Sequence, residues 1–147
     1  TAATTLELAK VDNIVAIKEA SGDFTQIMEM VQNKPEGFDI LSGDDAITMP
    51  MMALGVAGVI SVVANAFPKR FAEMVHSTAD DKMDAAREAH YDLLPVTHML
   101  FEEGNPGGVK VALERQGLMK PIMRMPLYPI SQDLRTRIEK ETDRIIG

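Results

Sequence analysis

Three short apolar runs, each followed by turn-forming residues and then by a helical pattern, constrain the fold of this chain more than any other feature. They begin near residues 14, 38 and 58, so strand and helix together repeat at roughly 20–25 residues, close to the repeat of parallel α/β folds. The pattern predicts strands at Ile14–Lys18, Phe38–Ser42 and Gly58–Val62, with helices at about 24–32 and 45–54 between them.

The remainder of the chain has a helical pattern. Thr4 or Thr5 is expected to cap a short first helix with Leu6 and Ala9 turned inward, and Asp23 is expected to cap the second. After Ala64, where a further helix begins, we predict helices at Lys69–Thr78, Asp81–Phe101 with Pro95 inside it, Val109–Gln116, and from a Ser131 cap to Ile146. We therefore divide the chain into an α/β part, residues 1–78, and a helical region, residues 79–147.

Lys18 is the first candidate for chemistry. The preceding Ile14–Ile17 run is apolar throughout, which is typical of a strand buried on both faces. An amine held in such surroundings loses hydration, which favours its neutral, nucleophilic form, so Lys18 is a candidate Schiff-base former. The alternative is a surface lysine that marks where a strand meets water.

Polar residues follow each predicted strand, and this coincidence favours the chemical interpretation. Ligands of parallel sheets collect at the carboxyl ends of the strands. Lys18, the segment 42–45 and the segment 61–65 all fall at that edge. Gly43 allows a ligand to approach the backbone closely, and Ile60 is placed to shield the amine from water.

Other polar residues are interpreted as structural. Asp44 and Asp45 suggest a divalent-metal pair, but no third ligand has suitable spacing, so a helix cap is the favoured role and we expect no metal site. Glu19 should point to the face opposite Lys18 and anchor the structure or its loop. The three histidines are expected to pack or to lie at the surface, and they are His76, His90 and His98.

Composition excludes several classes of partner. The net charge of −7 provides no basic surface for nucleic acid. The longest apolar run, Met49–Ala57, contains Pro50 and Gly55 and is too short to span a bilayer, so no membrane partner is expected. The lack of cysteine suits a cytoplasmic location. No signal peptide opens the chain, and because it begins as if a helix were already under way, we expect sequence before Thr1.

Four blocks of sequence, in this order and spacing, resemble the carboxyl-terminal half of enzymes of the dihydrodipicolinate synthase family, which are pyruvate-dependent class I aldolases. They are Ile-Lys-Glu-Ala-Ser-Gly-Asp at 17–23, Leu-Ser-Gly-Asp-Asp-Ala at 41–46, Gly-Val-Ile-Ser-Val-Val-Ala-Asn at 58–65, and Glu-Gly-Asn-Pro at 103–106. The resemblance implies strands six to eight of a TIM (β/α)₈ barrel, about three βα units, followed by an all-helical carboxyl-terminal extension.

The resemblance also implies a reaction. Lys18 would form an imine with pyruvate, with no separate cofactor, and Gly43 and Ile60 would line the pocket. The derived enamine would attack L-aspartate 4-semialdehyde, and cyclisation would give 4-hydroxy-tetrahydrodipicolinate, on the route to diaminopimelate and lysine. In the family the helical extension helps to build a tetramer.

The chain departs from the family pattern because the catalytic segments that precede the lysine strand are absent. Its tyrosines, Tyr91 and Tyr128, lie in the helical region and cannot take the role of the family's proton relay. The missing amino-terminal half of the barrel is therefore an expected partner, and activity of this chain alone is doubtful. Two alternatives stay open: another pyruvate-dependent aldolase, acting on N-acetylneuraminate or a sugar acid, and a non-catalytic assembly fragment.

Overall fold

Three parallel strands form one sheet, as the sequence predicts, and their order in the sheet follows their order in the chain. The computed structural model describes all residues, 1–147, and places β1 at Ala16–Glu19, β2 at Asp39–Ser42 and β3 at Gly58–Val59. Lys18 pairs with Leu41, and Leu41 pairs with Gly58. The third strand is shorter than predicted, because its residue pairing with β2 ends at Val59 and only the Ile60 N–H bonds to β2 beyond it.

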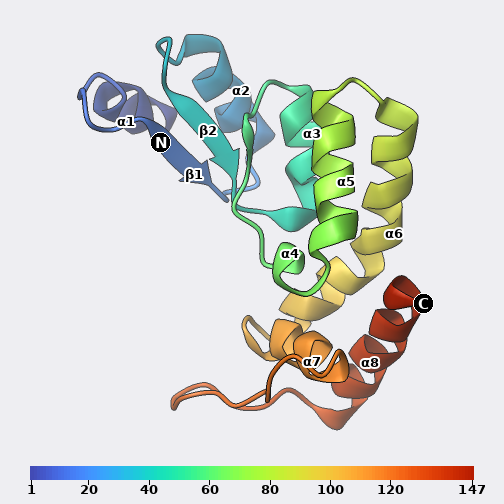
Figure 1. Ribbon diagram of the computed structural model, residues 1–147. Helices are drawn as coiled ribbons and strands as arrows, with labels where there is room; N and C mark the ends of the chain where they lie inside the picture. The colour runs from blue at the N-terminus through green and yellow to red at the C-terminus, as the bar shows by residue number, and fades with distance from the viewer.

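Helices connect the strands and form the rest of the chain (Figure 1). In chain order they are α1 (Ala2–Leu8), α2 (Phe24–Asn33), the 3₁₀-helix η1 (Asp45–Ile47), α3 (Thr48–Ala53), α4 (Val63–Ala66), α5 (Pro68–Ala79), α6 (Met83–Glu102), α7 (Gly107–Arg115) and α8 (Gln132–Ile146). The helices predicted after residue 64 are confirmed to within a few residues. None of them combines the length and the apolar character needed to cross a membrane.

Helix caps account for where several helices begin. Asp23 accepts a hydrogen bond from the Gln26 N–H at 3.1 Å, and Ser131 Oγ accepts one from the Leu134 N–H at 3.2 Å, so both predicted caps are confirmed. The predicted cap of α1 was wrong, because the helix starts earlier and Thr1 is its cap. Ala2 and Thr5 are its buried side chains, and Ala9, which was expected to turn inward, is partly buried against the smaller core.

Two apolar cores hold the chain together. A smaller one lies between the sheet and α1–α3, and its members are Ala2, Ile27, Met30, Phe38, Ile40, Met51 and Val56. A larger one joins α3–α8 and includes Phe71, Met74, Ala89, Leu93, Leu100 and Leu134. Because α5 packs against α6 within this core, side chains from both sides of residue 78 share it.

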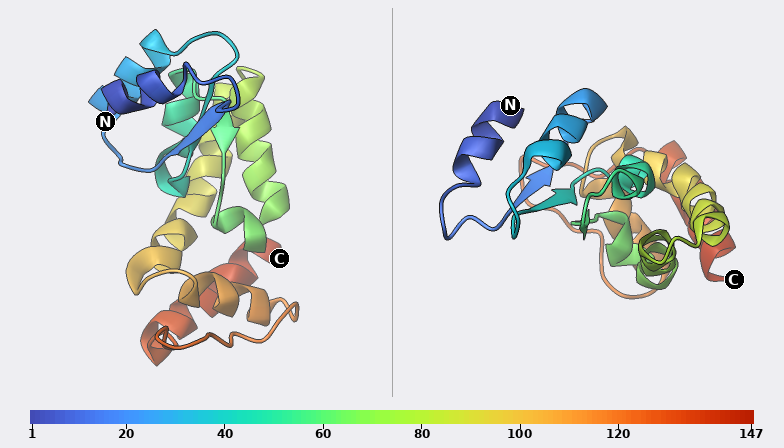
Figure 2. Two further views of the ribbon diagram at one scale, coloured as in Figure 1. Left: turned by 90° about the vertical axis from the view of Figure 1, so that its left-hand side faces the viewer. Right: turned by 90° about the horizontal axis from the view of Figure 1, so that it is seen from above.

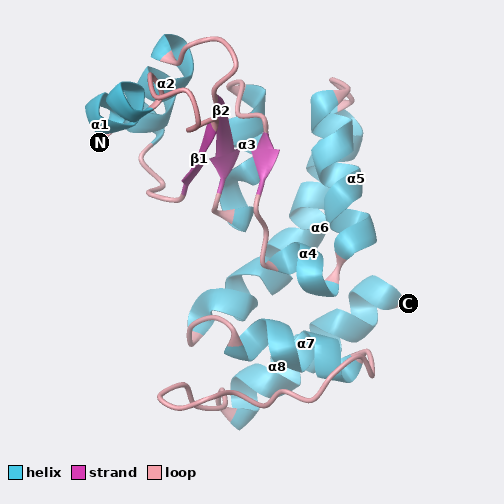
Figure 3. Ribbon diagram, turned by 60° about the vertical axis from the view of Figure 1, so that its left-hand side comes forward, coloured by secondary structure: helices cyan, strands magenta, loops and turns pink.

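The sheet has one covered and one open face. Seen from above, α1 and α2 lie on the same side of β1 and β2, and no helix covers their other side (Figure 2); the three strands lie side by side in Figure 3. Ile17 and Ile40 point into the core under the helices. Lys18 is exposed, and Val15 is 63% exposed. The prediction that the Ile14–Lys18 strand is buried on both faces was therefore wrong for this chain, because no helix covers the face that bears Lys18.

Candidate active site

Lys18 and Gly43 are in direct contact at the carboxyl end of the sheet. Lys18 lies on β1, and Gly43 directly follows β2, with its N–H donating to the Glu19 carbonyl oxygen at 2.7 Å. A Cβ atom placed on Gly43 would lie 2.6 Å from Lys18 Cε and 3.0 Å from Lys18 Cγ. The Lys18 side chain thus lies against the backbone of residue 43, where glycine leaves room for it because it has no Cβ atom.

The alternation of side chains along β1 separates Lys18 from Glu19, as predicted. Glu19 is 7% exposed and lies on the covered face. Its carboxylate Oε1 accepts a hydrogen bond from the Ser21 N–H at 2.5 Å, which fixes the turn after the strand. The expectation that Glu19 anchors the structure is confirmed, because this hydrogen bond holds the turn that follows β1, next to Lys18.

Ile60 lies at the same edge as Lys18 and Gly43. Its N–H donates to the Ser42 carbonyl oxygen at 2.9 Å, so the ladder between β2 and β3 continues to this residue. The side chain is 50% exposed, on the open side of the sheet. Lys18, Gly43 and Ile60 therefore lie at the carboxyl ends of three neighbouring strands, while the roles expected for them stay predictions.

The two aspartates after Gly43 have different partners. Asp44 accepts a hydrogen bond from the Ala46 N–H at 3.0 Å and caps η1, as predicted for one of the pair. Asp45 is 4% exposed, and its Oδ2 accepts hydrogen bonds from the N–H groups of Val62 and Val63 at 2.9 and 3.1 Å. Sequence reasoning missed this second role, because its partners lie 17 and 18 residues along the chain.

A pocket of about 480 Å³ adjoins the Gly43 turn, between the loop after β2 and the last turns of α6. It is lined by Ala20, Gly43, Asp44, Ala46, Thr97, His98, Phe101 and Glu102. Sequence periodicity places His98 and Glu102 on one helix face but gives no sign that this face meets the carboxyl edge of the sheet. A cavity therefore lies next to the residues that support the lysine.

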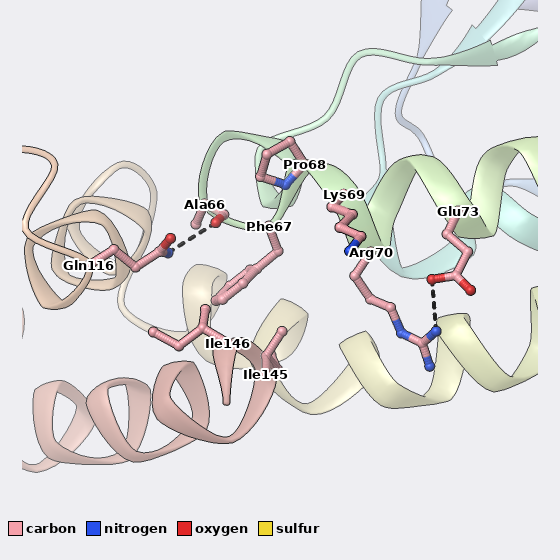
Figure 4. Close-up of a pocket in the computed structure, with 9 residues that line it drawn as sticks. All are labelled: Ala66, Phe67, Pro68, Lys69, Arg70, Glu73, Gln116, Ile145 and Ile146. Atoms are coloured by element: carbon pink, nitrogen blue, oxygen red, sulfur yellow. Dashed lines mark hydrogen bonds and ion pairs between the residues drawn. The ribbon is translucent and has the colours of Figure 1, made fainter.

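A second pocket of about 450 Å³ contains none of the predicted site residues (Figure 4). It lies between the start of α5 and the ends of α7 and α8. Gln116 donates to the Ala66 carbonyl oxygen at 2.9 Å on one side, and Arg70 is paired with Glu73 at 2.9 Å on the other. The charges of Arg70 and Glu73 are engaged with each other, and Ile145 and Ile146 close the apolar side.

The histidines have the packing and surface positions expected of them. His76 and His98 are exposed, whereas His90 is buried in α6 with its ring edge against Tyr91, at 5.0 Å between centroids. Burial lowers the pKa of His90 below its ordinary value. No three His, Asp or Glu side chains gather as a metal site would require.

Comparison with known proteins places this geometry in a family. Residues 1–145 match the Dihydrodipicolinate synthetase family. The 4-hydroxy-tetrahydrodipicolinate synthase of Parabacteroides distasonis is 45% identical over 130 residues, which are 88% of this chain and 44% of that protein. The synthase of Flavobacterium psychrophilum is 43% identical over 143 residues, 97% of this chain and 49% of that protein. The chain spans about half the length of the curated relatives that it matches.

Solved structures agree with the sequence match. The dihydrodipicolinate synthase of Aquifex aeolicus superposes with a TM-score of 0.93 at 36% identity, covering 98% of this chain and 50% of that one. The enzyme of Acinetobacter baumannii, solved in complex with pyruvate, gives 0.93 at 30% identity, with 99% and 50% coverage. The strands and helices described above correspond to the carboxyl-terminal half of these TIM barrels and their helical extension. The chain therefore belongs to the dihydrodipicolinate synthetase family.

Proposed function

We propose that Lys18 forms an imine with pyruvate, as the first step of 4-hydroxy-tetrahydrodipicolinate synthesis. The observation that carries this proposal is the contact between Lys18 and Gly43 at the carboxyl edge of a parallel sheet, where ligands of such folds bind. Membership of the family supports it, as does the pyruvate complex of the Acinetobacter relative. Gly43 and Ile60 would line the pocket around the imine.

The chemistry requires an amine and a series of proton transfers. The Lys18 amine adds to the keto carbon of pyruvate, and water leaves to give the imine. Loss of a methyl proton gives an enamine, whose carbon attacks the aldehyde of L-aspartate 4-semialdehyde. The amino group of that substrate then attacks the imine carbon, which closes the ring and frees Lys18. The covalent imine is the electron sink, so the proposal includes no further cofactor.

We further propose that the site works only in a completed barrel. By this term we mean the chain together with a segment that carries the five other βα units, on the same polypeptide or on a second one. Two observations support it: the relatives are about twice as long, and the sheet face that bears Lys18 is open. Parallel sheets are stable when both faces are covered, and unpaired strand edges favour association.

Borohydride trapping tests the proposal. The completed barrel is incubated with pyruvate and sodium borohydride, and mass spectrometry of its peptides should locate one reduced pyruvyl group, on Lys18. Lys18→Arg should abolish the adduct. Lys10→Arg is the matched control, since Lys10 is an exposed lysine paired with Glu7 on α1, and it should leave the adduct unchanged. An adduct on another lysine would refute the assignment to Lys18, and the absence of any adduct would favour a non-catalytic assembly role.

The aldehyde acceptor is tested separately, because the imine is common to all pyruvate-dependent aldolases. Turnover of pyruvate with L-aspartate 4-semialdehyde should exceed turnover with N-acetylmannosamine or sugar aldehydes, and the reverse order would identify an N-acetylneuraminate or sugar-acid lyase.

We also propose a cytoplasmic location and assembly into a homotetramer. One relative is a monomeric dihydrodipicolinate synthase variant, so sedimentation of the completed barrel is the test for the tetramer.

A further inference from the structure

The carboxylate of Asp45 links the two loops that carry Gly43 and Ile60. Asp45 begins η1, two residues after Gly43, and it is almost completely buried. Its Oδ2 accepts hydrogen bonds from the N–H groups of Val62 and Val63, which follow Ile60 by two and three residues. One oxygen atom therefore joins the segment after β2 to the segment after β3.

The Gly43 turn is fixed to the sheet without help from Asp45. The Asp44 N–H donates to Ser42 Oγ at 3.2 Å, and the Thr48 hydroxyl lies 2.8 Å from the Asp44 carbonyl oxygen. Ser42 and Thr48 are both fully buried. This polar cluster holds the turn that supports Lys18, so the turn is a fixed point against which another loop can be positioned.

The segment after Ile60 has fewer attachments. The sheet ladder holds it through the Ile60 N–H, and beyond that residue the hydrogen bonds to Asp45 are its connection to the β2 side. At the start of α4, Ser61 Oγ accepts a hydrogen bond from the Ala64 N–H at 2.8 Å, which satisfies one of the free N–H groups there. Asp45 satisfies the Val62 and Val63 N–H groups, so its carboxylate caps α4 from another loop and ties the start of this helix to the segment after β2.

A buried carboxylate is costly unless its oxygens are paired, and Asp45 Oδ1 is buried without a hydrogen-bond partner. A buried carboxylate that bridges two loops of a candidate site fits a role in positioning. We propose that Asp45 is a positioning residue, which sets the distance of Ile60 from Gly43 and thereby the width of the pocket around the Lys18 amine. The inference rests on the proposed function.

The expected effect falls on formation of the imine. If the two hydrogen bonds are lost, the Ile60 segment can move away from the lysine, and pyruvate is held less well for attack. Displacements of about 1 Å can reduce rates about 100-fold, so we expect Asp45→Ala to lower kcat/KM for pyruvate by about 10- to 100-fold. Asp45→Asn keeps an acceptor oxygen but loses the charge, so its loss should be smaller, about 2- to 5-fold.

The test compares these variants in the completed barrel, with kcat, KM for pyruvate and the rate of borohydride trapping as readouts, well below the unfolding temperature. Ile138→Ala is the matched control, since it removes a fully buried side chain from α8, far from the site. It should lower the melting temperature while leaving KM and trapping unchanged. The proposal is supported if kcat/KM falls in the order wild type, Asp45→Asn, Asp45→Ala. If Asp45→Ala does not fold, the proposal is tested by whether kcat/KM falls in Asp45→Asn.

A double-mutant cycle with Ile60→Ala identifies the route of the effect. If Asp45 acts through Ile60, the change at Asp45 should cost much less once the Ile60 side chain is gone, whereas general damage would give additive losses. The inference would be overturned by wild-type kinetics in Asp45→Asn and in any folded Asp45→Ala, or by additive losses in the cycle. In either case, trapping at Lys18 in the wild type would leave the proposed function standing. Absence of that wild-type adduct overturns both.

Discussion

The side chain of Lys18 lies across the backbone of Gly43, where a Cβ atom on residue 43 would stand 2.6 Å from Lys18 Cε. The same atom would lie 2.9 Å from Ala20 Cβ, so the space is closed on two sides. Any side chain at position 43 must therefore displace the lysine or the turn after β1. The contact joins the first and second strands at the point where the chemistry is proposed.

We predict that Gly43→Ala lowers the rate of pyruvate trapping at Lys18 by about 10- to 100-fold, because the amine is moved from its position. The control is Gly58→Ala on the neighbouring strand, where a new Cβ would have its nearest contact at 3.7 Å, an ordinary van der Waals distance. Trapping by both variants is measured in the completed barrel. Equal trapping by Gly43→Ala and wild type would show that the contact has no part in imine formation.

Local patterns were sufficient to predict much of the fold. Asp23 and Ser131 were identified as caps because the acceptor and donor are three residues apart. The alternation of a strand was enough to place Glu19 opposite Lys18. The carboxyl ends of the three strands were predicted to lie together, because a βα repeat implies parallel strands and parallel strands end at one edge of the sheet.

Long-range contacts were not available from such patterns. The bonds from Asp45 to Val62 and Val63 cross 17 and 18 residues, and a helix cap was the simpler explanation for an aspartate after a turn. The exposure of Val15 was missed for a related reason. An apolar run indicates a strand that is buried in the assembled fold, and it does not tell which chain supplies the cover.

We predict that the free energy of unfolding depends on His90 below about pH 6.5, its ordinary pKa. Burial lowers the pKa of His90 in the folded chain, so between the two values the unfolded state binds the proton and the folded state does not. Stability must then fall as the pH falls below about 6.5. Urea unfolding from pH 7.5 to 5 should show this slope, and His90→Gln should reduce it.

His76→Gln is the control for that experiment, because His76 is the exposed histidine of α5 and its removal leaves the buried one in place. The slope should persist in this variant. A slope of the same size in His90→Gln would mean that other groups cause it.

We predict that Asp92→Asn destabilises the helical region by about 1–3 kcal/mol. Asp92 on α6 accepts hydrogen bonds from Arg144 of α8 at 2.5 Å and from Arg70 of α5 at 2.8 Å, so it joins three helices. Burial raises the pKa of Asp92, but the hydrogen bonds and charges of Arg144 and Arg70 outweigh it and lower the pKa overall. The contribution of Asp92 to the free energy of unfolding should be present above about pH 4 and lost at more acid pH, where its carboxylate is protonated.

The control for Asp92 is Asp84→Asn on the same helix. Asp84 is fully exposed and pairs only with Arg87, one turn away. The urea unfolding midpoint of the Asp84→Asn variant should therefore match that of the wild type. Equal midpoints for Asp92→Asn and Asp84→Asn would show that the three-helix junction contributes nothing measurable.

We predict that Gly108→Ala destabilises the junction of α6 and α7 by about 1–3 kcal/mol. A Cβ atom on Gly108 would lie 2.7 Å from Leu100 Cα and 2.9 Å from the Leu100 carbonyl oxygen, and backbone atoms inside a helix cannot move aside without moving the helix. Gly107→Ala is the matched neighbour, since its Cβ would meet the Ile130 side chain, which can rotate away. Thermal unfolding should rank wild type, Gly107→Ala and Gly108→Ala in falling order, and the reverse order of the two variants would contradict the close packing of the helix backbones.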